Sequence, residues 1–268
     1  MIKFFRKIRY GHMKKNKIGA YLKYAIGEII LVVIGILIAL SINNLNTNRI
    51  NNQAEKVILN NLKKDLALEL ENLNSHKTSQ NIWINSGTQI LKNYDNNDGF
   101  FVNDKLLAYI NDLMIRASFL PNLTTFETLE NTGKLDLIKN EELKEKIVVY
   151  YSAISIFSEN TTKNNTTLVD KLINQKLIEL TLFKTNSFSR EMREWWPVSD
   201  LENYKLKNSN NFKQQIQRKL NKTDNAINLI NVVNFRMFLA NIQLDFVQKI
   251  QLDTRNLIKA LEGELNKN

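Results

Sequence analysis

Histidine is the first residue type to consider for chemistry, because its ordinary pKa lets it act as a base near neutral pH. The chain of 268 residues contains two histidines, His12 and His76, and no cysteine. His12 lies in a basic N-terminal stretch, so a catalytic triad would depend on His76. Nothing near His76 has metal-ligand spacing, and we expect it to be an exposed polar helix residue. We assign no catalytic, cofactor-binding or metal-binding residue.

Paired carboxylates are the second candidate, because two of them at a suitable distance hydrolyse glycosidic bonds. Three closely spaced pairs lie among lysines and are typical of solvated helix faces: Glu69/Glu71, Glu127/Glu130 and Glu142/Glu145. The chain has no Gly-rich phosphate loop and no His-Glu-x-x-His motif. We therefore expect no enzyme, and a hydrolase of envelope material is kept as a second alternative.

The net charge of +10 is concentrated at the N-terminus. Residues 1–23 contain no acid and eight basic residues, namely Lys3, Arg6, Lys7, Arg9, Lys14, Lys15, Lys17 and Lys23. After residue 45 no basic stripe is interleaved with aromatic residues, so we expect no nucleic-acid partner. Such a basic segment beside an apolar stretch is an orientation signal for a membrane protein.

The apolar stretch runs from Tyr24 to Ile42 and has one charge, Glu28. As a helix it would be roughly 28 Å long, which is close to the hydrocarbon thickness of a bilayer. The sequence therefore predicts three parts: a basic cytoplasmic segment at 1–23, a transmembrane helix at 24–42, and an extracytoplasmic helical domain at 43–268. The positive-inside rule places the N-terminus in the cytoplasm and the domain in the periplasm.

Two alternatives remain open within this stretch. Ala39-Leu40-Ser41 resembles a signal-peptidase site, and cleavage there would leave Ile42 as the mature N-terminus. The apolar run is longer than a usual signal core, which favours an uncleaved anchor at the inner membrane. Glu28 is either a headgroup-level partner of Lys23 or a functional carboxylate within the bilayer.

Few helix breakers occur after the span, since the whole chain has two prolines and eight glycines. A helical stripe follows at Leu59, Leu62, Leu66, Leu70 and Leu73. Nothing between Ile42 and Leu73 stops a helix, so we expect the transmembrane helix to continue to about residue 94. Gly87 is a possible weak point, and residues 95–99 (DNNDG) predict a turn.

Boundary signals then predict two short helices and one longer helix. They are a cap at Asn103 or Asp104 for a helix at 103–118, the breaker Pro121, a capping box at Thr124-x-x-Glu127, a C-terminal cap at Gly133, and an N-terminal cap at Asn140. The longer helix has a stripe from Leu143 to Phe157, which resumes at Leu168. The polar residues 158–167 between them are either a projecting part of this helix or a loop.

The rest of the chain predicts an irregular segment followed by one long helix. Residues 184–208 are irregular, and we expect Trp195 and Trp196 to dock into the domain. The last helix spans about 210–265, and its apolar section 226–240 predicts a centrally buried part. The fold class is therefore all-α: one N-terminal transmembrane helix continuing towards an antiparallel bundle of long helices, with short helices between them.

Three stretches resemble an uncharacterised family of Bacteroidota membrane proteins: MIKFFRKIR, KYAIGEIILVVIGILIALSINN and TTFETLENTGKLDLIKNEELKEKIVVYYS. The stretch from Gly27-Glu28 through Gly35 to Asn43-Asn44 carries most of the resemblance, and together the three cover about a third of the chain. Family members often have Trp after the double Asn, where this chain has Leu45. The resemblance implies a single-pass inner-membrane protein with a helical domain of unknown function and no catalytic residues.

Two functions follow from this organisation. We expect a periplasmic interaction or sensing module held in the lipid bilayer, with a protein partner or a small ligand. The alternative is a structural homo-oligomer of the envelope, formed along the span and the stripe from Leu59 to Leu73.

Overall fold

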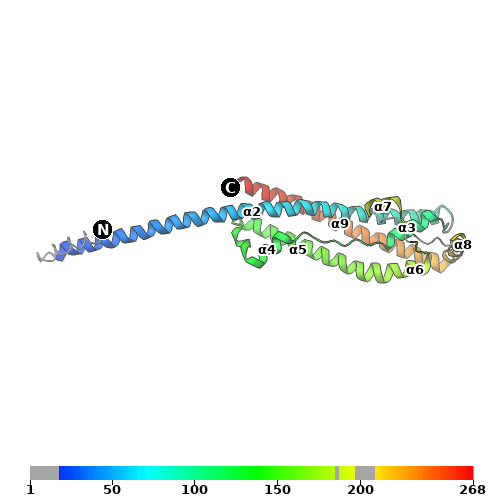
Figure 1. Ribbon diagram of the computed structural model, residues 1–268. Helices are drawn as coiled ribbons and strands as arrows, with labels where there is room; N and C mark the ends of the chain where they lie inside the picture. The colour runs from blue at the N-terminus through cyan, green and yellow to red at the C-terminus, as the bar shows by residue number, and fades with distance from the viewer. Residues whose placement is uncertain (1–17, 185–186, 197–208, 268) are drawn as a thin grey trace. The chain divides into compact units, whose positions relative to one another are not determined.

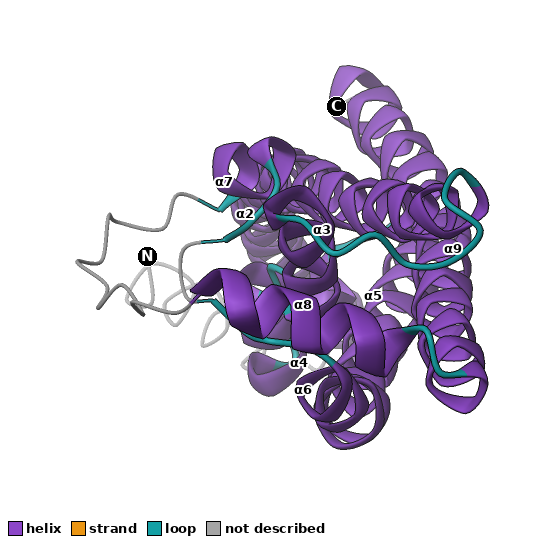
Figure 2. Ribbon diagram, turned by 90° about the vertical axis from the view of Figure 1, so that its right-hand side faces the viewer, coloured by secondary structure: helices purple, strands orange, loops and turns teal. Residues whose placement is uncertain are grey.

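The computed structural model describes residues 18–184, 187–196 and 209–267, and within them it contains helices and loops and no strand (Figure 2). The all-α prediction is confirmed. The basic segment up to residue 17 and Pro197 lie outside the described residues. The elements are α2 (Ile18–Asp95), α3 (Asp104–Met114), α4 (Thr124–Thr132), the 3-10 helix η1 (Lys134–Leu137), α5 (Glu141–Asn164), the π-helix η2 (Asn165–Asn174), α6 (Gln175–Leu180), α7 (Arg190–Trp195), α8 (Ser209–Leu220) and α9 (Thr223–Lys267).

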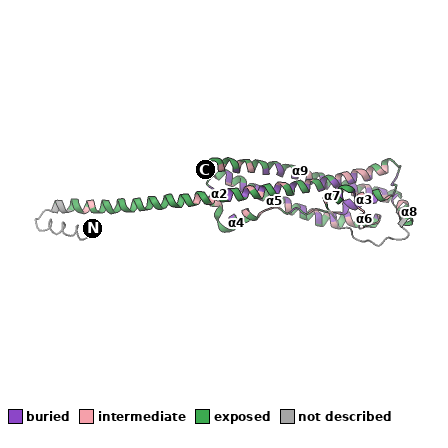
Figure 3. Cartoon of the chain, turned by 45° about the horizontal axis from the view of Figure 1, so that its top comes forward, coloured by how far each residue is buried: buried purple, intermediate pink, exposed green. Residues whose placement is uncertain are grey.

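Helix α2 continues without interruption from the apolar stretch to Asp95, as the lack of breakers predicted. Its most apolar window has a mean hydropathy of 2.8, and none of that window is buried (Figure 3). By length and composition, this is the one helix among the described residues that is able to cross a membrane. The chain divides into two compact units, Met1–Val57 and Ile58–Asn268.

The unit Ile58–Asn268 contains four rods that lie side by side (Figure 1). The rods are α2 after Ile58, the connection from α3 to α4, the continuous run α5–η2–α6, and α9. Pairs of hydrogen bonds fix their directions, because residues 243 and 251 of α9 bond to residues 76 and 74 of α2, and residues 254 and 264 of α9 bond to residue 150 of α5 and its cap residue 140. Helix α9 is therefore antiparallel to both α2 and α5.

The second rod returns along α2 in the opposite direction, and only part of it is helical. Residues 112, 122 and 125 of this rod hydrogen-bond to residues 86, 69 and 65 of α2, respectively. Helix α3 ends at Met114, earlier than the predicted end at residue 118, and no helix follows until Thr124. Pro121 accounts for part of this non-helical stretch, because a proline restricts the preceding residue to extended conformations.

Several local signals form the predicted structures. The side-chain oxygen of Asn103 accepts from the backbone N–H of Leu106, and Asn140 caps α5 at Leu143 in the same way. Gly133 has φ 66° at the end of α4, which is the left-handed conformation expected of a glycine cap. The turn after α2 has positive φ at Asp98 and Gly99. Gly87 does not interrupt α2.

The capping box at Thr124 does not form as predicted. Thr124 is the first residue of α4 instead of its cap, and the preceding Leu123 has no side-chain hydrogen bond to the helix. The carboxylate of Asp65 on α2 instead accepts from the backbone N–H of Thr125 at 3.1 Å. A negative charge from a neighbouring helix therefore replaces the local cap and faces the positive end of α4.

Residues 158–167 are helical, so the loop alternative is wrong. The chain passes from α5 into the π-helix η2, with buried residues every four positions at 161, 165, 169, 173 and 177. In an α-helix, residues four positions apart are rotated by about 40° relative to each other around the helix axis. A π-helix has i→i+5 hydrogen bonds and a wider turn, so it offsets this drift and keeps the stripe on one face.

The last predicted helix is two helices in the structure. Helix α8 ends at Leu220 and α9 begins at Thr223, because Asn221 bonds to the loop after α2. Its side chain accepts from Phe100 N–H at 2.7 Å and donates to Phe100 C=O at 3.1 Å. The section 226–240 is buried on one side only, since Ile227 and Phe238 are 52% and 56% exposed.

The interior consists of two apolar clusters separated by a polar layer on α2 and α9. One cluster includes Ile82 and Ala240, and the other includes Leu73 and Val247. The leucines of the predicted stripe at 59, 62, 66 and 73 are at most 1% exposed within the chain. A homo-oligomer along that stripe would therefore require the domain to open.

Candidate functional site

The polar interior is organised around the extended residues 115–123. Backbone carbonyls in a non-helical segment need hydrogen-bond donors when they are buried. Side chains of the flanking helices supply them: Asn174 donates to Met114 C=O at 3.1 Å, Asn165 to Ala117 C=O at 2.8 Å, and Ser158 to Phe119 C=O at 2.7 Å. Ser158, Asn165 and Asn174 therefore face the extended segment, whereas the polar residues at 159, 160, 162, 163, 166 and 167 are exposed.

Arg236 of α9 donates hydrogen bonds to two backbone carbonyls of this region. It is 2% exposed, and it donates from Nε to Leu113 C=O at 3.1 Å and from Nη2 to Ile115 C=O at 3.0 Å. Its guanidinium lies 3.9 Å from the ring centroid of Trp83, in cation–π geometry. Burial lowers the pKa of Arg236 to about 9, so the side chain remains a cation at neutral pH. This cation also faces the negative end of the α3 dipole.

His76 lies in the polar layer between the two apolar clusters, and the prediction that it is exposed is wrong. It is 3% exposed, and its Nε2 is 2.9 Å from Oε1 of Gln243 and 3.0 Å from Nε2 of Gln80. Burial is the main cause that lowers the pKa of His76, and the charge of Arg236 lowers it further. Burial therefore favours the neutral ring, although the hydrogen bond with Gln243 acts in the opposite direction on the pKa.

Two carboxylates are also buried in this unit. Glu69 accepts from the backbone N–H of Asn122 at 2.6 Å, and Asp112 accepts from Ser86 Oγ at 2.7 Å and Ser189 N–H at 3.0 Å. Burial raises the pKa of both groups above the usual range. The prediction of a solvated Glu69 is therefore wrong. Its pair partner Glu71 is exposed, and so are both members of the other two acid pairs.

The chemistry of this interior is structural. Among residues 18–184, 187–196 and 209–267, no group of three metal-ligating side chains is placed to hold a metal ion. The hydrogen bonds of His76, Arg236 and Asp112 go to amides, backbone groups and hydroxyls. Each group thereby fixes the position of a neighbouring segment.

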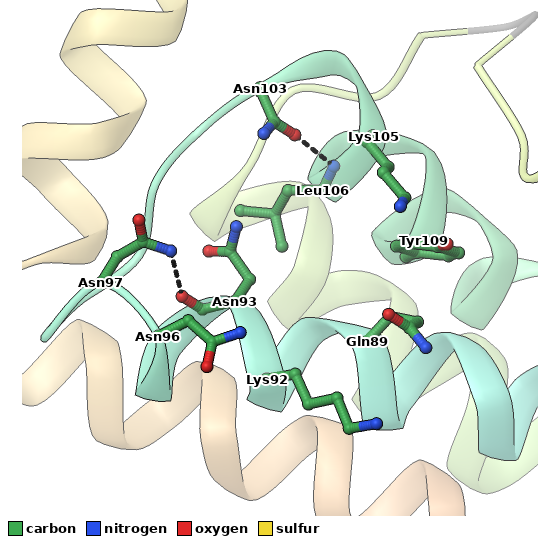
Figure 4. Close-up of a pocket in the computed structure, with 9 residues that line it drawn as sticks. All are labelled: Gln89, Lys92, Asn93, Asn96, Asn97, Asn103, Lys105, Leu106 and Tyr109. Carbon is green, nitrogen blue, oxygen red and sulfur yellow. Dashed lines mark hydrogen bonds between the residues drawn. The ribbon is translucent and has the colours of Figure 1, made fainter.

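A polar pocket opens at the surface between the end of α2 and the start of α3 (Figure 4). Its volume is about 200 Å³. Four asparagines, one glutamine, two lysines, one tyrosine and one leucine line it. Sequence reasoning missed this pocket, because Lys92 and Lys105 come together only when α3 folds back on α2.

The paired tryptophans have different positions. Trp195 docks into the domain as predicted: its ring centroid is 6.4 Å from that of Trp83, and its Nε1 donates to Ser75 at 3.2 Å. Trp196 is 46% exposed, so the prediction that it docks is wrong. Sequence reasoning also missed Arg236, although one signal was present, since this charge lies within the apolar section 226–240.

Comparisons with known proteins identify a family for the chain and no function. Neither the curated proteins nor the solved structures contain a match. A family model described as a family of unknown function, DUF6090, matches residues 28–179, which extend from the apolar part of α2 to α6 and exceed half of the chain. The expected resemblance to an uncharacterised family is confirmed, and its Bacteroidota origin stays a prediction. The chain belongs to the DUF6090 family of unknown function.

Proposed function

We propose that this protein is a membrane-anchored periplasmic module that binds a partner or ligand and performs no catalysis. The continuity of α2 carries the proposal, because one helix contains both the exposed apolar window and the leucines of the domain core. The eight basic residues before the span favour a cytoplasmic N-terminus at the inner membrane. Residues of the apolar window and residues of the domain core thus belong to the same helix.

An exposed apolar row on α9 supports a protein partner. Phe238, Ile242 and Phe246 recur every four residues and are 56%, 36% and 52% exposed. Exposed apolar residues that gather on one helix face are typical of interaction surfaces. The surface pocket is lined by amides and lysines, and this favours binding over carboxylate-based hydrolysis.

Reporter fusions after Asn268 test the orientation. We expect a reporter that folds only in the periplasm to be active, and a reporter that is active only in the cytoplasm to be silent. The opposite pattern would contradict the periplasmic placement. Sequencing of the purified N-terminus checks the anchor, because a chain beginning at Ile42 would show that the span is cleaved.

Cross-linking in native membranes tests the interaction role. We expect a heterologous product that weakens in Phe238→Ser and Phe246→Ser. Leu252→Ser is the control, since this α9 residue is 57% exposed and lies outside the row. Products between copies of this chain alone would support the structural homo-oligomer instead.

A further inference from the structure

The surface pocket has walls that are fixed by their own hydrogen bonds (Figure 4). The side chain of Asn93 accepts from Phe101 N–H at 3.0 Å and donates to Phe101 C=O at 3.1 Å. Asn103 caps α3, and Asn97 donates to the backbone oxygen of Asn93 at 2.7 Å. The loop between α2 and α3 is thus held in place before any ligand binds, which lowers the entropic cost of binding.

The charge of the pocket is positive. Lys92 comes from α2 and Lys105 from α3, and neither forms an ion pair within the described part of the chain. The lining residues include no carboxylate. Asp104 lies next to the pocket in sequence, but its carboxylate is neutralised by Lys213 at 2.7 Å and Lys184 at 2.9 Å. These two ion pairs hold the pKa of Asp104 below its usual range.

The lining also defines the uncharged part of a ligand. Each amide has two N–H donors and an oxygen with two lone pairs, so the asparagines that fix the loop retain a second donor or acceptor. With Gln89, this remaining capacity suits hydroxyl groups. Tyr109 provides an aromatic wall, and the Lys105 ammonium lies 5.9 Å from its ring centroid. A volume of about 200 Å³ is of the size of one small molecule. An ammonium group on a ligand would be repelled by the two lysines and would have no carboxylate to pair with. Amines and amino acids are therefore excluded as ligands of this pocket.

We infer that this pocket binds a small hydroxylated anion, of the class of sugar acids and sugar phosphates. The two lysines pair with the carboxylate or phosphate as charge-assisted donors, and the amides bind the hydroxyl groups. The inference rests on the proposed sensing function, since it names the ligand class that such a module would detect.

Calorimetric titration of the full-length protein in detergent tests this inference. The probes are D-glucuronate and D-glucose 6-phosphate, with D-glucose as the neutral control and D-glucosamine as the cationic control. We expect one or both anions to bind at least about tenfold more tightly than the two controls. The stronger of the two anions identifies the acidic group.

Variants locate the site. Lys92→Gln and Lys105→Gln should each weaken binding of the preferred anion by about tenfold. Lys64→Gln is the matched control, because this lysine is also exposed on α2 and lies outside the pocket. All three side chains are exposed, so the thermal midpoints should stay within about 2 °C of the wild-type value.

Three outcomes would overturn the inference. They are equal affinity for glucose and the anions, unchanged binding in both pocket variants, and, where glucose 6-phosphate is the preferred anion, equal affinity for inorganic phosphate titrated as a further probe. The orientation of the chain is irrelevant in detergent, so a failure of the reporter experiment and a failure of binding are separate results. Loss of binding in Lys64→Gln to the same extent would also count against the pocket, because it would show a diffuse charge effect.

Discussion

Arg236 is a cation in the domain interior whose hydrogen-bond partners are backbone carbonyls. A buried charge is costly unless its donors are satisfied, and Arg236 meets this requirement with Leu113 C=O, Ile115 C=O and the face of Trp83. Its role is thus to stabilise the end of α3 and the start of the extended segment. His76, Glu69 and Asp112 have comparable roles at other points of the second rod and α9.

Removing the guanidinium should destabilise the domain. Arg236→Met leaves two buried carbonyls without donors, and we expect the free energy of unfolding to fall by about 2 kcal/mol or more. Arg236→Lys keeps the charge but lacks the planar fork, so it should restore only part of the loss. Denaturant unfolding in detergent measures both. The exposed Arg255→Met is the control, and equal stability of Arg236→Met and wild type would show that the carbonyls find other donors.

His76 should make stability depend on pH. Its pKa in the fold is lower than the ordinary 6.5, so the unfolded chain binds the proton more tightly. The stabilisation is fully present above pH 6.5 and is lost as the pH falls below that value. We expect the free energy of unfolding of wild type, relative to His76→Gln, to decrease on acidification by at most about 1.4 kcal/mol per pH unit.

The comparison with His76→Gln is needed because other groups act in the opposite direction. The raised pKa values of Glu69 and Asp112 make acidification favour the folded state through these groups. Their contribution is present in both proteins and cancels in the difference. A difference that stays constant between about pH 7.5 and pH 5.5 would contradict a buried neutral histidine.

Among the secondary-structure elements, α4 depends most clearly on a neighbour. Its first turn receives Asp65 from α2, and the adjacent Asn122 N–H is bound by Glu69 of the same helix. Helix α2 therefore holds both α4 and the end of the extended segment. Displacement of α2 along its axis would strain these two contacts first.

The cap of α4 can be tested by comparing two substitutions. Asp65→Ala removes the acceptor of Thr125 N–H and should cost about 1 kcal/mol of stability. Thr124→Ala should be within about 0.5 kcal/mol of wild type, because the Thr124 side chain is exposed and does not cap the helix. Thermal and denaturant unfolding measure the two effects. The reverse order would show that the local capping box operates after all.

For the molecule as a whole, the core residues all lie in the unit Ile58–Asn268. Both apolar clusters belong to this unit, whereas the apolar window of α2 contributes nothing buried. This apolar window is therefore not a part of the folded core. With the membrane anchoring proposed above, lipid would cover its exposed apolar surface.

A fragment comprising residues 46–268 should fold without detergent. We expect a monodisperse, helical protein with a cooperative thermal transition, because both clusters and the polar layer are retained. Circular dichroism and size-exclusion chromatography check this, with the full-length chain in detergent as reference. Aggregation of the fragment, or a transition without cooperativity, would mean that the span also supports the fold.

The sequence by itself determined the features that depend on neighbours along the chain. The apolar stretch, the caps at Asn103, Gly133 and Asn140, and the turn at residues 95–99 follow from local composition and local hydrogen bonds. Periodicity also predicted the all-α class, because the apolar stripes mark which helix faces need a partner. The candidate site was not predictable in the same way.

Only the tertiary structure decided which polar residues are buried and what they bind. Arg236 is 123 positions from Leu113, and His76 is 167 positions from Gln243. Periodicity shows that a helix face is apolar, but the extended segment between α3 and α4 creates a need for donors that no local pattern records. The long-range arrangement of backbone carbonyls therefore places Arg236 and Asn165 in the interior.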